Sequence, residues 1–88
     1  MARGQLDTIE ITKLAEHGAA DGMYNLGLMY SIGKDVAIDL VTAHKWFNLA
    51  AMRGNLEARK YRAELAAEMS PIEVAEAQRQ AREWLATH

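Results

Sequence analysis

The chain has 88 residues, of which half are hydrophobic and a quarter are charged. This length suits one domain, and the composition is typical of a folded protein and not of a disordered one. The formal net charge is −2 and there is no cysteine. These features argue against a nucleic-acid-binding chain, a disulfide framework, a thiolate metal site and a cysteine nucleophile.

Helix-forming residues dominate and β-branched runs are missing, so we predict an all-α fold of five helices. The first covers 7–17 and places Ile11, Leu14 and Ala15 on one face, with Gly18 closing it in the left-handed conformation. The second covers 20–32. Its apolar stripe has the i, i+3, i+4, i+7 spacing of a buried helix face and consists of Met23, Leu26, Gly27 and Tyr30.

The third predicted helix, "LVTAHKWFNLAAMR", covers 40–53. Asp39 is expected to cap its start, and Gly54 ends it. One face of this helix carries Ala43, Phe47, Ala50 and Ala51, with Trp46 beside them.

The last two predicted helices follow without a long loop between them. The fourth, "LEARKYRAELAAEM", has a stripe of Ala58, Tyr61, Leu65 and Met69. The fifth opens with "SPIE", a capping box in which Ser70 and Glu73 cap each other's backbone and Pro71 takes the first helical position. Its apolar face consists of Val74, Ala77, Ala81, Trp84 and Leu85. Glu76, Arg79 and Glu83 have the spacing of ion pairs on the solvent side.

The sequence contains a weak internal repeat. A shift of 36 residues lays Ala15 and Gly18 on Ala51 and Gly54, at the ends of two predicted helices. The same shift lays Gly22 on Ala58, a small residue on a small residue.

The stretch "YNLGLMYSIGKDVAIDLVTAHKWFNLAAMRGN" resembles a Sel-one-like repeat, a relative of the tetratricopeptide repeat. The matching positions are Tyr24, Leu26, Gly27, Tyr30, Gly33, Val36, Asp39, Ala43, Trp46, Ala50, Ala51 and Gly54. Two positions depart from the family pattern. Asp35 replaces a loop glycine, and Ala37 stands where proline is common.

The resemblance implies a fragment of an α-solenoid built from α-helical hairpin repeats. Residues 7–18 would form a half repeat, 19–54 a full repeat, 55–69 the first helix of the next repeat, and 70–88 a capping helix. Gly27 would then be a packing glycine, facing the small side chains of Ala43 and of Ala50 or Ala51. The general role of the family is to bring proteins together, often in bacterial signalling or envelope processes, without a cofactor or a reaction.

We find no pattern that indicates catalysis. His17, His44 and His88 lie far apart in the sequence and have no companions at metal-ligand spacing. We expect His17 at a helix end and His44 on the surface. No nucleophile or phosphate-binding motif is present. The sequence therefore predicts a protein that is not an enzyme and has no catalytic residue, metal ligand or cofactor.

Candidate partner-binding residues follow from the resemblance, because the first helix of each repeat lines the concave surface in this architecture. Asn25, Leu28 and Ile32 would face inward, and their counterparts in the next repeat are Tyr61, Glu64 and Glu68, although Tyr61 is alternatively a buried residue. The segment "RGNLEARKYR" is rich in basic residues and offers an anion site built from Asn25 with Lys60 or Arg62. A solvated charged face is the favoured interpretation of that segment. The candidates for partner binding are Asn25, Leu28, Lys60, Arg62 and Glu64.

Several large side chains allow two interpretations. Met23, Met29, Met52 and Met69 suit an adaptable binding groove, but core filling is favoured because they occur at helical spacing. Trp84 either closes the terminal face or is exposed for a partner.

The sequence thus predicts an interaction module or adaptor that binds a peptide or helix of another protein. The alternative is a structural unit that self-associates as a homo-oligomer, or a small regulatory subunit of a larger assembly. No nucleic acid and no membrane span are expected. The chain lacks the apolar core of a signal peptide, so we expect it in the cytoplasm, or in the periplasm if a leader was removed.

Overall fold

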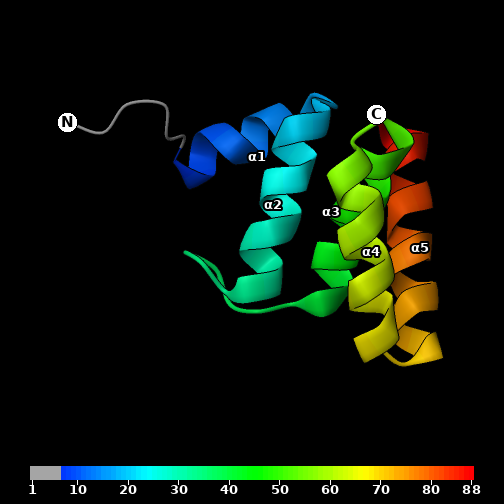
Figure 1. The fold of residues 1–88 in the computed structure, drawn as a ribbon. Coiled ribbons are helices and arrows are strands. Elements are labelled where there is room, and N and C mark those ends of the chain that lie inside the picture. The colour runs from blue at the N-terminus through cyan, green and yellow to red at the C-terminus, as the bar shows by residue number, and fades with distance from the viewer. Residues whose placement is uncertain (1–6) are drawn as a thin grey trace.

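The computed structural model describes residues 7–88, and these form an all-α structure (Figure 1). The helices are α1 (Thr8–Glu16), α2 (Ala20–Ile32), α3 (Leu40–Met52), α4 (Leu56–Glu68) and α5 (Pro71–Thr87). No strand occurs within 7–88. The all-α class and the five predicted helices are therefore confirmed.

Side-chain caps stabilise the starts of α1, α3, α4 and α5. The Asp39 carboxylate accepts a hydrogen bond from the backbone N–H of Thr42 at 3.1 Å, as predicted. The predicted capping box at α5 is also confirmed, because Ser70 Oγ accepts from Glu73 N at 3.1 Å and Glu73 Oε1 accepts from Ser70 N at 2.8 Å. A second capping box, formed by Asp7 and Glu10, starts α1.

The first three turns between helices use left-handed residues. Gly18 has a φ of 84°, as predicted, and Gly33 and Gly54 have φ values of 77° and 96°. Asp35, which stands where the family pattern has a glycine, also has a positive φ of 64°. Aspartate enters this region more readily than most residues, so the loop keeps its path without the glycine.

The bounds of α2 and α4 have the 36-residue offset that the sequence suggested. The starts of α2 and α4, Ala20 and Leu56, are 36 residues apart, and so are their ends, Ile32 and Glu68. The turns before these two helices have the same hydrogen bonds. Gly18 N donates to Ala15 O and Ala19 N to Leu14 O, while Gly54 N donates to Ala51 O and Asn55 N to Ala50 O, all at 2.9–3.0 Å. Both are Schellman turns.

Helix α3 is the centre of the packing. It contacts α2, α4 and α5, while α1 packs on α2 (Figure 1). The buried apolar side chains are Ala15, Met23, Leu26, Met29, Ala43, Trp46, Phe47, Leu49, Ala50, Ala58, Leu65, Met69, Ala77, Ala81 and Trp84. Tyr24, Tyr30 and Ala51 pack against this core while half-buried.

Gly27 allows a close helix contact, but its neighbour differs from the prediction. A Cβ atom added at Gly27 would lie 2.6 Å from Cδ1 of Phe47, so the expected facing residues, Ala43 and Ala50 or Ala51, were wrong. The ring of Phe47 occupies the space that the missing side chain leaves. A second packing glycine is Gly22, which the 36-residue shift had laid on Ala58. Its Cβ would lie 2.6 Å from Leu14 Cβ and 2.8 Å from Ala15 N in α1.

Two further expectations about burial were wrong, those for His44 and Met52. His44 is 3% exposed and not on the surface, because its side of α3 is covered when α4 packs against it. Met52, at the end of α3, is 58% exposed and fills no core. Leu14 and Leu85 remain about two-fifths exposed, at 40% and 38%, since each lies at the margin of its helix's packed face.

Helix α5 corresponds in part to α3. Ala43, Trp46 and Phe47 in α3 and Ala81, Trp84 and Leu85 in α5 have the same spacing, 38 residues apart. Trp84 is 7% exposed, which decides between its two interpretations in favour of closing the packed face. The two indole rings meet edge to face, with centroids 6.0 Å apart.

Candidate functional site

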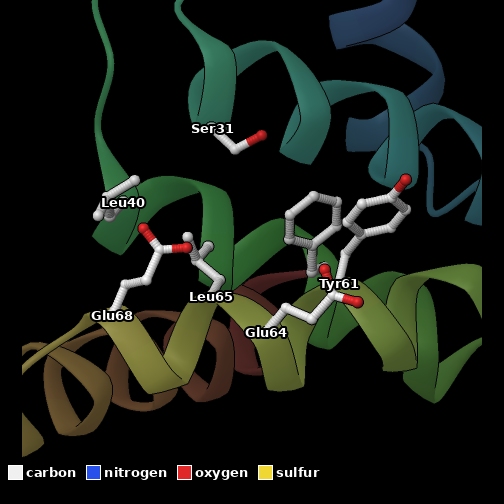
Figure 2. Close-up of a pocket in the computed structure, with 7 residues that line it drawn as sticks. Ser31, Leu40, Tyr61, Glu64, Leu65 and Glu68 are labelled. Atoms are coloured by element: carbon white, nitrogen blue, oxygen red, sulfur yellow. The ribbon is translucent and has the colours of Figure 1, made fainter.

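An open groove runs between α2 and α4, with α3 beneath it (Figure 2). We call it the α2–α4 groove, and its volume is about 240 Å³. The residues that line it are Ser31, Leu40, Phe47, Tyr61, Glu64, Leu65 and Glu68. It is therefore formed by residues of α2, α3 and α4.

Aromatic side chains form one end of the groove. Tyr61 is 36% exposed and stacks on Phe47, with ring centroids 5.8 Å apart and planes inclined by 20°. The Tyr24 ring lies against both of these rings. Its centroid is 6.1 Å from that of Phe47 and 6.0 Å from that of Tyr61. Burial, with Tyr61 and Glu57 nearby, raises the pKa of Tyr24. The cluster fixes the position of the Tyr61 ring while leaving part of it accessible.

Two carboxylates line the α4 side of the groove. Glu64 and Glu68 are four residues apart, so they project from the same face of α4, about 6 Å apart along its axis (Figure 2). Within residues 7–88 neither forms a salt bridge, and no lysine or arginine is among the lining residues. The groove is therefore an acidic surface with an apolar floor.

The lining offers few neutral polar groups. Ser31 Oγ donates to the carbonyl of Leu28 at 2.9 Å, so its proton is used within α2. The lining parts of α2 and α4 are helical, and helices satisfy their own backbone groups. A partner would thus meet mainly side chains here.

The structure brings some of the predicted site residues together and separates others. Glu64 lines the groove, as do Tyr61 and Glu68, which had been assigned to the concave surface. Asn25 and Leu28 are half-buried in α2 and are not part of the lining, and Ile32 is 66% exposed.

The anion site predicted from the basic segment is not assembled in the groove. Lys60 is exposed and Arg62 is half-buried, and neither lines the groove. Arg62 Nη1 donates to Asn48 Oδ1 of α3 at 2.7 Å. That guanidinium therefore links α4 to α3.

Sequence reasoning missed four residues of the groove, namely Ser31, Leu40, Phe47 and Leu65. The helical spacing of the sequence indicated two of these residues. Ser31 lies one helical turn after Gly27, and Leu65 one turn after Tyr61, so both continue stripes that had been recognised. Leu40 and Phe47 belong to the second helix of the hairpin, which the concave-surface argument did not include.

A second group of titratable residues lies in α3, outside the groove lining. The Nδ1 atom of His44 is buried without a hydrogen-bond partner. Burial lowers the pKa of His44, and the nearby Arg62 lowers it further. Lys45 Nζ lies 4.5 Å from the centroid of the Trp46 ring, and burial lowers the pKa of this amine. These groups belong to the packing of α3 against its neighbours.

The chemistry of the described part of the chain is that of helix surfaces. In residues 7–88 no three His, Cys, Asp or Glu side chains gather where they could hold a metal ion. None of the helices in this range has the length and apolar character needed to cross a membrane. Models of known protein families give no match to the chain, and no curated protein matches it. The geometry of the groove is therefore the basis for the function proposed below.

Proposed function

We propose that this chain is a non-enzymatic interaction module of the Sel-one-like repeat type, and that its α2–α4 groove binds a peptide or helix of a partner protein. The observation that carries the proposal is the groove itself, an open depression with Leu40, Phe47 and Leu65 inside and charged side chains at its edge. Recognition by such a groove needs no reaction and no cofactor.

The repeated backbone supports the choice of family. Two 13-residue helices of matching bounds follow two Schellman turns, 36 residues apart. Consecutive repeats are also tied together, because Arg53 Nη1 donates to Gly18 O at 3.4 Å and Asn55 Nδ2 donates to Asp21 Oδ1 at 3.3 Å. Equivalent turns of neighbouring repeats stack in this way in helical-repeat proteins.

The size of the groove supports a macromolecular partner. Pockets that enclose drug-sized molecules usually measure roughly 300–1,000 Å³. At about 240 Å³, and open to solvent, this groove suits one or two side chains projecting from a partner's surface.

A displayed library of random peptides tests the proposal. Peptides selected on the native protein are measured against Ser31→Trp, which places an indole in the groove, and against Ala75→Trp, which adds the same ring to the exposed side of α5. We expect Ser31→Trp to abolish binding and Ala75→Trp to leave it unchanged, with circular dichroism showing both variants folded. Selected peptides that bind both variants equally would contradict the proposal.

Self-association is a second candidate function, favoured by exposed apolar side chains. Ile32, Ile38, Leu56 and Ile72 are each more than 60% exposed, at 66%, 63%, 73% and 81%. Sedimentation equilibrium over a wide concentration range tests it. A concentration-dependent mass that Ile32→Ser and Ile72→Ser abolish would favour the oligomerising unit, and a constant monomer mass would eliminate it.

A further inference from the structure

We infer that the occupant of the α2–α4 groove is a basic amphipathic helix, carrying two Lys or Arg side chains four residues apart beside a bulky apolar residue. This inference rests on the proposed function and specifies its ligand. It follows from the charges that line the groove, from the shape of its apolar floor and from the polar groups that the lining lacks.

The charges select a basic partner. Glu64 and Glu68 form no salt bridge within residues 7–88, and no basic side chain lines the groove. An incoming Lys or Arg would therefore meet carboxylates that are not already paired, whereas an acidic segment would be repelled. Complementary charges of this kind contribute mainly to specificity and to the rate of association.

The spacing of the carboxylates matches a helix. They lie one turn apart on α4, about 6 Å along the axis. Basic residues at i and i+4 of a partner helix lying along α4 have the same separation, so both pairs can form together. Between them, Leu40, Phe47 and Leu65 offer an apolar floor for one large side chain of the partner.

The polar groups favour a helix over an extended peptide. An extended peptide obtains much of its affinity from main-chain hydrogen bonds, whereas a helix satisfies its own backbone. The neutral polar groups of the lining are the hydroxyls of Ser31 and Tyr61, and the Ser31 proton is already donated to Leu28 O. The walls therefore have little to offer an extended main chain.

Fluorescence anisotropy with three labelled peptides tests the inference. Each has about 20 residues, long enough to form a helix. The first places Arg at i and i+4 beside a Leu, the second has Glu in place of both Arg residues, and the third carries a central Pro that breaks the helix. We expect the first peptide to bind and the other two to bind at least about tenfold more weakly. Added salt should weaken the first interaction.

A pair of charge-matched variants locates the interaction. The double variant Glu64→Gln with Glu68→Gln should bind the Arg peptide about tenfold more weakly. Glu16→Gln with Glu83→Gln removes the same charge from exposed sites outside the groove and should leave binding unchanged. Equal effects of the two pairs would overturn the inference, since they would show attraction to net charge alone.

The remaining outcomes separate this inference from the proposed function. Tight binding of the Glu peptide or of the Pro peptide, blocked by Ser31→Trp, would overturn the basic helix while the groove remains a binding site. Failure of all three peptides to bind would overturn the basic helix, and the library selection described above would then decide on the groove independently.

Discussion

At Gly27 the chain gives up helix propensity, about 1 kcal/mol relative to alanine, for contact with an aromatic ring. Phe47 is 1% exposed and stacks on Tyr61, so it cannot move aside easily. The need for a small residue at this place was predicted from the resemblance of the surrounding stretch to a Sel-one-like repeat. The identity of the neighbour was not, because Ala43 and Phe47 lie one turn apart on the same face of α3, and the position of α3 along α2 decides which of them lies opposite Gly27.

The variant Gly27→Ala is predicted to lower the free energy of unfolding, because an overpacking cost of ~1–3 kcal/mol exceeds the gain in helix propensity. Urea denaturation measures the change. In a Phe47→Leu background the same substitution should cost less, because the ring that opposes it is gone. An equal cost in both backgrounds would contradict the contact.

His44 is predicted to make stability depend on pH. Its pKa in the folded protein is lowered from the ordinary value of 6.5 by burial and by Arg62, so the unfolded chain binds its proton more readily. Stability should be complete above about pH 6.5 and should fall as the pH drops from there toward the pKa of the folded state.

The substitution His44→Gln should flatten this dependence in denaturation curves measured between pH 8 and pH 5. A separate loss is expected at lower pH from Glu76, whose pKa is lowered to about 2 by hydrogen bonds from Arg79 and Gln80. That loss should begin near pH 4.5 and end near pH 2. An unchanged slope above pH 5 in His44→Gln would contradict the role of the buried imidazole.

At the scale of the elements, the positions of the helix ends were more predictable than the identity of the helices that pack against one another. Caps such as Asp39 and Ser70 act within four residues of sequence, so a single sequence contains the information. The burial of His44 and the exposure of Met52 depend on helices that pack from elsewhere in the chain. The same reason explains why Leu40 and Phe47, which come from α3, were missed as groove residues while Glu64 was included.

Removal of the cap at α5 should destabilise the protein. Ser70→Ala deletes the hydroxyl that accepts from Glu73 N, and we expect a loss of about 1 kcal/mol in the free energy of unfolding. Thr87→Ala, at the exposed end of the same helix, removes a hydroxyl that contacts carbonyls of its own last turn and should change stability by less than about 0.5 kcal/mol. Equal losses in the two variants would argue against the capping box.

The edge-to-face pair of Trp46 and Trp84 joins α3 to α5 and should be a main source of stability. Trp46 is 6% exposed, so Trp46→Ala should cost about 3–5 kcal/mol. Chemical denaturation monitored by circular dichroism measures this loss. A negligible change would mean that α5 does not depend on this contact.

At the scale of the whole molecule, the helices form a small unit with a radius of gyration of 12.3 Å. A compact domain of this length is expected to measure about 12 Å. The all-α class followed from composition and periodicity, and the 36-residue offset from the spacing of two glycine turns. The groove could not be predicted in the same way, because it depends on the angle at which α2 and α4 lie over α3. No local sequence pattern determines that angle. That angle places the acidic side chains of α4 opposite Ser31 (Figure 2).

The central claim is that a partner segment occupies the α2–α4 groove, and chemical-shift mapping tests it most directly. A selected peptide is titrated into 15N-labelled protein while the backbone amide signals are followed. We expect the largest shifts to cluster at Ser31, Leu40, Tyr61 and Leu65, and Ser31→Trp to remove them. Shifts concentrated on α1 or on the exposed side of α5, with the groove signals unchanged, would contradict it.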